Sequence, residues 1–233
     1  MSTPYIVPPP AVSTVPVRGK DAVFPVNRIF CVGRNYAAHA AEMGTQPDKE
    51  EPFYFTKSPS TIVPSGATVA YPPETANYHH EMELVAAIGA PVFRASLDNA
   101  LDAVLGYACG LDMTRRDLQL RAREKQRPWD LGKDFEESAV IGEIVPADAI
   151  GHPTRGVIEL KVNGAVRQHA DLSELINSVA EIIVHLSRFY HLQPGDLIYT
   201  GTPAGVGTVV PGDRITGHID GIGEITLDIA PQA

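Results

Sequence analysis

Residues 79–89 have the sequence HHEMELVAAIG, in which two acidic side chains interrupt an otherwise apolar run. In a β-strand the side chains at positions i and i+2 lie on the same face, so Glu81 and Glu83 are predicted to lie together. Met82 and Leu84 would then point to the opposite face. On a helix the two carboxylates would diverge. The stretch therefore predicts a strand that carries an acidic pair on one face.

Further strands are expected on both sides of this stretch. Ile158, Leu160 and Val162 alternate before the dipeptide Asn163-Gly164, which favours a type I′ turn, so a hairpin is predicted there. Prolines and a glycine interrupt residues 53–71, where brief strands and turns are expected. Additional strands are predicted at residues 27–33, 104–111, 197–200 and 225–229.

Helical spacing of apolar residues is much rarer. It predicts one long amphipathic helix from about Glu174 to Tyr190, ended by Pro194 and Gly195. Strands outnumber helices and do not alternate regularly with them, which disfavours a doubly wound parallel sheet. The expected fold class is α+β and mostly β.

Two shorter helical segments are also predicted. In the first, Asn35 is a candidate N-cap for the alanine-rich turn 36–43, which Gly44 would close. A second segment follows the strand at residues 104–111, with Asp112 and Thr114 as candidate caps.

Length and composition place the chain among ordinary globular proteins. It has 233 residues without an internal repeat, which predicts one domain over residues 28–233 after a proline-rich arm at residues 1–27. No apolar run approaches the roughly 20 residues of a membrane span, and no signal peptide is recognisable, so a cytoplasmic location is expected. A net charge of -9 argues against nucleic acid as a partner. Cys31 and Cys109 are too few for a disulfide scaffold or a four-thiolate zinc site.

The acidic pair suggests a metal site. Two carboxylates about 4 Å apart repel by about 4 kcal/mol at an effective dielectric near 20, and a divalent cation removes that penalty. Carboxylate oxygens without cysteine suit Mg²⁺ or Mn²⁺, with Asp112 as a candidate third ligand. The alternatives are that Glu81 and Glu83 form the solvated face of an edge strand and that Asp112 is a helix cap. Zinc is set aside because HHEME does not contain H-E-x-x-H.

Other polar residues could take part in chemistry. His39 and Glu42 are three apart, which on a helix lets the carboxylate orient the imidazole and raise its basicity; an exposed surface pair is the alternative. The turn GTPAGVG at residues 201–207 could present the Thr202 hydroxyl and its amides to a small carboxylate, or be a plain loop. Lys133 could face solvent or hold a ligand oxygen.

Six segments in order resemble the fumarylacetoacetate hydrolase family over essentially everything after about residue 27: GRNYAAHAAEMG, NYHHEMELVAAIG, GYACGLDMTRRDLQ, RPWDLGKDF, KVNGAVRQ and LIYTGTPAGVG. The resemblance implies a rolled, mixed β-sheet with few helices, usually in homodimers, and Mg²⁺ or Mn²⁺ near the open end of the sheet. It implies the following roles: metal ligands Glu81, Glu83 and Asp112; a catalytic dyad of His39 and Glu42; and substrate contacts from Arg116, Gln119, Lys133 and Thr202.

Within this family, the short GRNY opening of the matched region resembles that of the smaller acylpyruvate hydrolases, including fumarylpyruvate hydrolases of gentisate-type aromatic breakdown. The resemblance implies that His39 takes a proton from water, which attacks the distal carbonyl, and that pyruvate leaves as an enolate stabilised by the metal and by Lys133. Rival activities are decarboxylation of oxaloacetate or isomerisation and decarboxylation of a hydroxylated dienedioate. A catalytically silent, dimeric ligand-binding protein is the alternative of another class.

A dicarboxylate substrate would need a further cation for its distal group. The candidates are four arginines, each of which could equally face solvent: Arg34, Arg121, Arg123 and Arg127.

Overall fold

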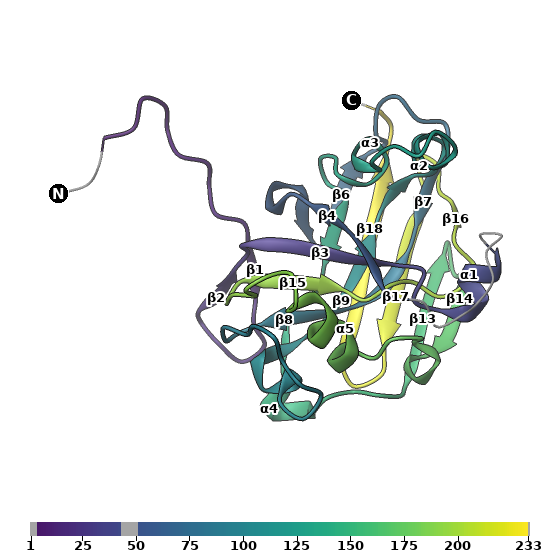
Figure 1. Ribbon diagram of the computed structural model, residues 1–233. Helices are drawn as coiled ribbons and strands as arrows, with labels where there is room; N and C mark the ends of the chain where they lie inside the picture. The colour runs from purple at the N-terminus through teal and green to yellow at the C-terminus, as the bar shows by residue number, and fades with distance from the viewer. Residues whose placement is uncertain (1–3, 43–50, 233) are drawn as a thin grey trace.

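The structure is a computed structural model that describes residues 4–42 and 51–232. Within these ranges it contains two mixed β-sheets that share one hydrophobic core, together with short helices (Figure 1). The predicted mostly β, α+β fold class is confirmed, and no doubly wound parallel sheet occurs among the described residues.

The larger sheet has eight strands. They are β3 (Arg28–Gly33), β4 (Phe53–Lys57), β5 (Ile62–Pro64), β8 (Met82–Ile88), β9 (Val104–Asp112), β11 (Ala139–Ile141), β12 (Val145–Pro146) and β15 (Asp196–Tyr199). Their order is β4-β3-β15-β8-β9-β11-β5, and β12 pairs with β9. The pairs β3–β15 and β5–β11 are parallel and the others antiparallel, so β8 and β9 lie inside the sheet.

The second sheet has five strands. They are β6 (Ala67–Ala70), β13 (Val157–Val162), β14 (Ala165–Asp171), β17 (Arg214–Ile219) and β18 (Gly223–Ala230), in the order β14-β13-β17-β18-β6. Asn163 and Gly164 have φ values of 52° and 80°. Both are left-handed, as a type I′ turn requires, so the predicted hairpin is confirmed.

Two small sheets complete the strands. One has the order β10-β7-β16, and the other pairs β1 with β2. Their bounds are β1 (Thr14–Pro16), β2 (Val23–Pro25), β7 (Tyr78–His80), β10 (Thr114–Arg115) and β16 (Gly207–Thr208). In Figure 1, β3 and β15 run across the view, whereas β17 and β18 run up it.

The core lies between the two large sheets. Met82 and Leu84 of β8 belong to it, as the alternation predicted, together with Leu160 and Ile215 of the second sheet. A Cβ atom built on Gly217 would lie 2.7 Å from the sulfur of Met82. A larger residue here would displace the Met82 side chain and crowd the carbonyl oxygen of Glu159, which lies 3.1 Å from the same Cβ position.

The helices are short and lie around the sheets. They are α1 (Ala37–Glu42), α2 (Arg116–Glu124), α3 (Asp130–Lys133), α4 (Ala147–Ile150) and α5 (Val179–Leu186), with 3₁₀ turns at Pro59–Thr61, Ala100–Ala103 and Leu172–Glu174. Figure 1 shows α2 and α3 above the sheets and α1 at their side.

The predicted helix from Glu174 to Tyr190 is wrong in its extent, because α5 is only eight residues long. Ser178 starts it through a capping box with Glu181, so the helix cannot begin earlier. Upstream, Leu175 is paired with Tyr36 in an isolated β-bridge. The helical spacing of the apolar side chains was real, but the cap and the bridge set the boundary.

The predicted caps of the other helices are also wrong. Asn35 binds the backbone of Asn177 and the carbonyl oxygen of Thr200 instead of capping α1. Asp112 ends β9, Thr114 lies in β10 and pairs with His79 of β7, and α2 begins only at Arg116. The predicted closure of the first helix by Gly44 lies outside the described residues.

The first part of the chain projects from the body as an extended segment, seen at the left of Figure 1. Residues 4–13 form no helix or strand. Beyond them, β1 and β2 pair and bury Val15 and Phe24 in a second core cluster. The division of the chain at residue 27 remains a prediction. Over the described ranges, each helix is too short or too polar to cross a bilayer.

Candidate active site

Antiparallel pairing of β8 with β9 brings the three predicted acidic residues together. Met82 pairs with Leu111, and next to them the amide of Asp112 donates a 2.9 Å hydrogen bond to the carbonyl oxygen of Glu81. Glu83 follows two residues later and shares the face of Glu81. One oxygen atom of each carboxylate lies within 4.8 Å of the others, and all three side chains are buried. The alternative that Glu81 and Glu83 form the solvated face of an edge strand is therefore excluded.

Three buried cations surround two of these carboxylates. Lys133 Nζ donates to Glu81 Oε2 at 2.8 Å and to Asp112 Oδ2 at 2.7 Å. Arg116 also donates to Glu81, and Lys57 Nζ lies 3.0 Å from Asp112 Oδ1. Burial alone would raise the pKa of Glu81, but Lys133 and Arg116 hold it well below its ordinary value. Glu81 is therefore an anion fixed by two cations.

Glu83 is in a different electrostatic position. Its Oε2 accepts a 2.7 Å hydrogen bond from the amide of Gly201. Burial raises the pKa of Glu83 well above its ordinary value, and the nearby Asp112 and Glu81 carboxylates raise it further. The acidic cluster is thus short of positive charge at Glu83.

The donor set fits a hard divalent cation. All three donors are carboxylates, the ligands that Mg²⁺ and Mn²⁺ prefer. Asp112 Oδ1 is buried and, despite the nearby Lys57 ammonium, accepts no hydrogen bond from the described part of the chain. Because a carboxylate offers about four lone-pair sites, the contacts with the lysines and the arginine leave room for coordination. Glu81, Glu83 and Asp112 could therefore hold such an ion.

His39 and Glu42 lie on one face of α1 and are paired. His39 Nδ1 lies 3.2 Å from Glu42 Oε2, and the amide of Gly205 donates to both Glu42 oxygens at 3.3 and 3.2 Å. His39 is 5% exposed, so the alternative of a surface pair does not hold for the imidazole. Burial lowers the pKa of His39 although Glu81 and Glu42 raise it. The expected gain in basicity is outweighed by burial, and the imidazole is neutral at pH 7.

α2 and α3 supply the cationic wall opposite β8. Arg116 and Gln119 are three residues apart on one face of α2, and both are buried. A Cβ atom on Gly132 would lie 2.8 Å from the amide nitrogen of Gln119, so α3 packs directly on α2. This contact places Lys133, which is 2% exposed and faces the acidic cluster instead of solvent.

The glycine-rich turn at residues 201–207 lines the opposite side of the site. Thr202 is buried, and its hydroxyl oxygen accepts a 2.8 Å hydrogen bond from Gln168 Nε2. Two amides of the turn thus bind carboxylates, but both carboxylates belong to the protein itself: Gly201 contacts Glu83 and Gly205 contacts Glu42.

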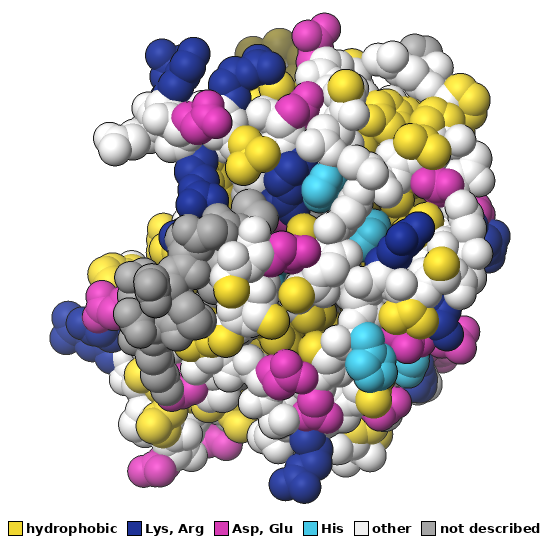
Figure 2. Space-filling view, turned by 90° about the vertical axis from the view of Figure 1, so that its right-hand side faces the viewer, with side chains coloured by type: hydrophobic (Ala, Val, Ile, Leu, Met, Phe, Trp, Pro, Cys, Tyr) yellow, Lys and Arg dark blue, Asp and Glu magenta, His cyan; other side chains and the backbone are white. Residues whose placement is uncertain are grey.

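A pocket joins these parts. Figure 2 shows lysine and arginine side chains gathered in the upper left of the face that it presents. Asp112 lies below the floor of the pocket and is fully buried. The lining residues are Val32, Gly33, Arg34, His39, Phe55, Glu81, Glu83, Arg116, Gln119, Arg123, Trp129, Lys133 and Thr202.

Two polar residues that support the site were missed from the sequence. Lys57 shares a face of β4 with Phe53 and Phe55, so the alternation in FYFTK could have placed its ammonium inward. Gln168, which holds Thr202, pairs with the core residue Leu160 in the hairpin and therefore shares its face. For both residues, the signal is the alternation of side chains between the two faces of a strand, and not a sequence motif.

Comparison with known proteins identifies relatives over nearly the whole chain. The model of the fumarylacetoacetate (FAA) hydrolase C-terminal family matches residues 28–230. A fumarylpyruvate hydrolase of Ralstonia sp is 61% identical over 191 residues, covering 81% of this chain and 99% of the relative. A mitochondrial oxaloacetate tautomerase of Homo sapiens is 40% identical over 201 residues, covering 86% of this chain and 90% of the relative.

A solved structure agrees with these sequence matches. The fumarylpyruvate hydrolase of Pseudomonas aeruginosa, crystallised in complex with Mn²⁺ and pyruvate, superposes with a TM-score of 0.96 at 51% identity. The match covers 98% of this chain and 100% of that one. From the family model, the sequence identity and the shared fold we conclude that the chain belongs to the fumarylacetoacetate hydrolase family.

Proposed function

We propose that this protein hydrolyses fumarylpyruvate to fumarate and pyruvate, with Mg²⁺ or Mn²⁺ held by Glu81, Glu83 and Asp112. The observation that carries the proposal is the convergence of these three buried carboxylates within 4.8 Å beside a pocket lined by His39. The Pseudomonas aeruginosa relative with Mn²⁺ and pyruvate supports the same ligand class.

A metal bound by these carboxylates would act as a Lewis acid toward the oxygens of the pyruvoyl group. The residues of the chain fix the substrate around it. Arg116 and Lys133 are the cations that face the pocket on the side of Glu81, and they can hold the pyruvoyl carboxylate and the oxygen on which negative charge develops. Gln119 and Thr202 offer hydrogen bonds from opposite walls.

His39 is the proposed general base. Its Nδ1 faces Glu42, which favours the tautomer with the proton on Nδ1 and leaves Nε2 as the acceptor. Because burial keeps the imidazole neutral at pH 7, Nε2 can take a proton from water as the water oxygen bonds to the distal carbonyl carbon. The carbon–carbon bond to the pyruvoyl methylene then breaks. The imidazolium returns its proton to that methylene carbon, which becomes the methyl group of pyruvate.

A pyruvate-release assay tests the proposal. Fumarylpyruvate, maleylpyruvate, acetylpyruvate and oxaloacetate are compared with Mn²⁺ and with chelator, and fumarylpyruvate should give the highest kcat/KM only with metal. His39→Asn should lower kcat by a factor of about 10² to 10⁴, whereas His169→Asn, at a surface position, should leave it unchanged. If the His39→Asn variant kept full hydrolytic activity, His39 would not be the general base.

Oxaloacetate chemistry is the second candidate, because a 40% identical relative is an oxaloacetate tautomerase. Enolate chemistry on oxaloacetate uses the same pyruvoyl contacts but needs no attacking water. In the same assay series, turnover of oxaloacetate that exceeds that of every acylpyruvate and survives in His39→Asn would favour this activity over hydrolysis.

A catalytically silent binding protein is tested by ligand-induced stability. Oxalate resembles the enolate of pyruvate, so it should raise Tm only when Mn²⁺ is also present. Binding of Mn²⁺ and oxalate without turnover of any substrate in the series would favour the silent protein.

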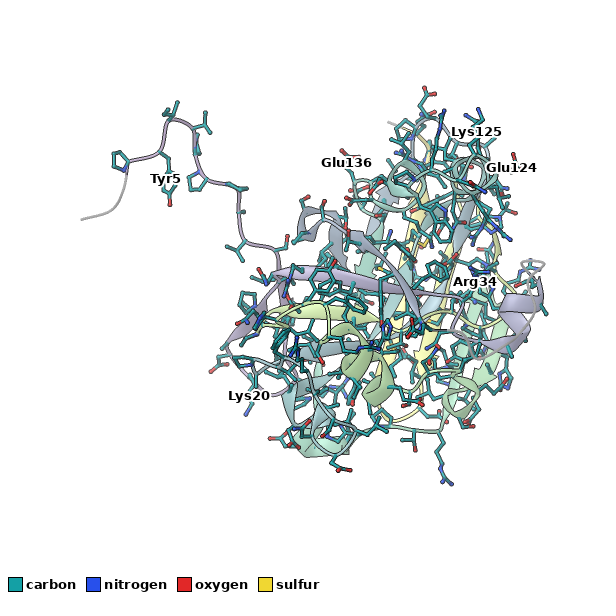
Figure 3. The ribbon with its side chains drawn as sticks, in the orientation of Figure 1. Tyr5, Lys20, Arg34, Glu124, Lys125 and Glu136 are labelled. Atoms are coloured by element: carbon teal, nitrogen blue, oxygen red, sulfur yellow. The ribbon has the colours of Figure 1, made fainter. Side chains whose placement is uncertain are left out.

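We also propose that the protein is a cytoplasmic homodimer. Tyr5, Ile6 and Val7 of the projecting segment are 70%, 105% and 70% exposed, so these apolar side chains do not pack on the body of their own chain. Figure 3 shows Tyr5 far from the sheets. A second copy could cover them. Light scattering should give twice the chain mass, and a monomeric mass at micromolar concentration would contradict the dimer; cell fractionation tests the location.

A further inference from the structure

The pocket continues outward from the acidic cluster along one face of α2. Arg116, Gln119 and Arg123 occupy positions i, i+3 and i+7 of this helix, and all three line the pocket. The first two are 4% and 5% exposed, whereas Arg123 is half-buried at the outer end. Seven residues at 1.5 Å each place Arg123 about 10 Å along the helix from Arg116. The pocket therefore has an inner and an outer cationic end.

Arg34 is the other half-buried arginine that lines the pocket. It follows β3, lines the same pocket, and its guanidinium carbon lies 4.8 Å from the centre of the Phe53 ring. Its φ of 53° is a left-handed conformation that a non-glycine residue rarely adopts. A Cβ atom on Gly33 would lie 2.1 Å from Phe53, so glycine there lets the ring approach. Figure 3 shows Arg34 between α1 and the end of α2 that carries Glu124.

An aromatic wall connects the two ends. Trp129 and Phe55 line the pocket, with their ring centres 5.9 Å apart. Phe55 also lies 4.8 Å below the ammonium of Lys133 at the inner end. A planar, unsaturated chain that reaches from Lys133 toward Arg34 would therefore run along aromatic rings.

The other two candidate arginines are not in this position. Arg121 is exposed and does not line the pocket. Arg127 is exposed and lines a neighbouring groove with Tyr54 and Pro128. The structure thus separates two inward arginines from two outward ones, which the sequence could not do.

We infer that Arg34 and Arg123 bind the distal carboxylate of the acyl group, so that the preferred acylpyruvates are dicarboxylates. This inference rests on the proposed function. The two carboxylates of such a substrate stand at opposite ends of its carbon chain, matching the inner Arg116 and Lys133 and the outer pair of arginines. Arginine suits this task because its planar fork binds a carboxylate through two parallel hydrogen bonds.

The test compares two substrates that differ at the distal end. Fumarylpyruvate carries a distal carboxylate, and acetylpyruvate carries a methyl group instead. In Arg34→Leu and in Arg123→Leu, the ratio of kcat/KM for fumarylpyruvate to that for acetylpyruvate should fall about ten- to hundred-fold, as expected for the loss of a charged hydrogen bond. Most of the loss should lie in KM. Arg121→Leu, on the exposed side of the same helix, is the matched control and should leave the ratio unchanged.

Inhibition by the products gives a second measurement that does not depend on acetylpyruvate turnover. Arg34→Leu and Arg123→Leu should raise the inhibition constant of fumarate about tenfold or more relative to that of pyruvate. An unchanged substrate ratio and unchanged fumarate inhibition in both variants, or equal losses for both substrates, would overturn the inference. If the wild-type protein hydrolysed no acylpyruvate, the proposed function itself would fail.

Discussion

Replacing Lys133 with methionine tests how the acidic cluster is held together. The side chain keeps nearly the same length but loses the ammonium, which contacts Glu81 at 2.8 Å, Asp112 at 2.7 Å and the Thr114 hydroxyl at 2.7 Å. All of these partners are buried. The Lys133→Met variant should therefore be strongly destabilised. The measurement is made with a chelator, so that no metal replaces the missing positive charge.

Two independent estimates give the size of this loss. Removing one partner of a buried ion pair costs about 3–5 kcal/mol. The protein can avoid this cost by protonating one carboxylate, which from a pKa near 4 costs about 4 kcal/mol at pH 7. A loss of about 4 kcal/mol corresponds to a drop in Tm of about 8–16 °C for a chain of this size.

The pH dependence gives a sharper signature. In the variant, the pKa of one carboxyl group is higher in the folded state than in the unfolded state. The stability of the variant therefore falls as the pH rises from the unfolded-state pKa to the folded-state pKa. The difference from wild type should thus be about 4 kcal/mol at pH 7 and about 1.4 kcal/mol at pH 5.

Urea unfolding and thermal melting across this pH range measure the difference. Lys161→Met is the matched control, because Lys161 pairs with Glu159 but is 41% exposed, and its loss should be under about 1 kcal/mol. Lys133→Arg, which keeps the charge, should recover part of the stability. If Lys133→Met were as stable as wild type at pH 7, the ammonium would not be what holds the carboxylates.

Three further changes have defined outcomes. Because burial lowers the pKa of His39 below its ordinary value of 6.5, kcat should fall as pH decreases, with the inflection below pH 6.5; an inflection above 6.5 would contradict the neutral buried imidazole. Gly164→Ala meets no atom within 4 Å, so its cost of about 1–2 kcal/mol in urea unfolding should come from φ alone, and an unchanged midpoint would argue against the type I′ turn. Asp196→Ala removes a buried acceptor that Arg28, Asn27 and the amide of Gln193 share; because the Arg28 side chain is 35% exposed and water can solvate it, the free energy of unfolding should fall by about 1–3 kcal/mol, and an unchanged value would show that these bonds do not stabilise the fold.

Features with a local cause could be predicted from the sequence. The hairpin at Asn163-Gly164 depends on two left-handed residues, and the common face of Glu81 and Glu83 depends on the period of a strand. Both follow from a few neighbouring residues. For the same reason the pairing of His39 with Glu42 follows from helical spacing.

Features set by contacts distant in sequence could not be predicted. The burial that lowers the pKa of His39 and the bridge between Leu175 and Tyr36 that stops a longer helix both come from packing of distant segments. The direction of Arg123 into the pocket and of Arg121 away from it depends on where α2 lies relative to β8. Helical spacing shows that these two arginines point apart but not which one faces inward.

Anomalous diffraction from crystals grown with Mn²⁺ shows whether the three carboxylates converge on one divalent ion. One manganese peak should lie within bonding distance of Glu81, Glu83 and Asp112, and it should disappear in Glu83→Gln crystals whose fold is unchanged. A peak bound by other residues, or none at saturating Mn²⁺, would show that these carboxylates do not form the metal site.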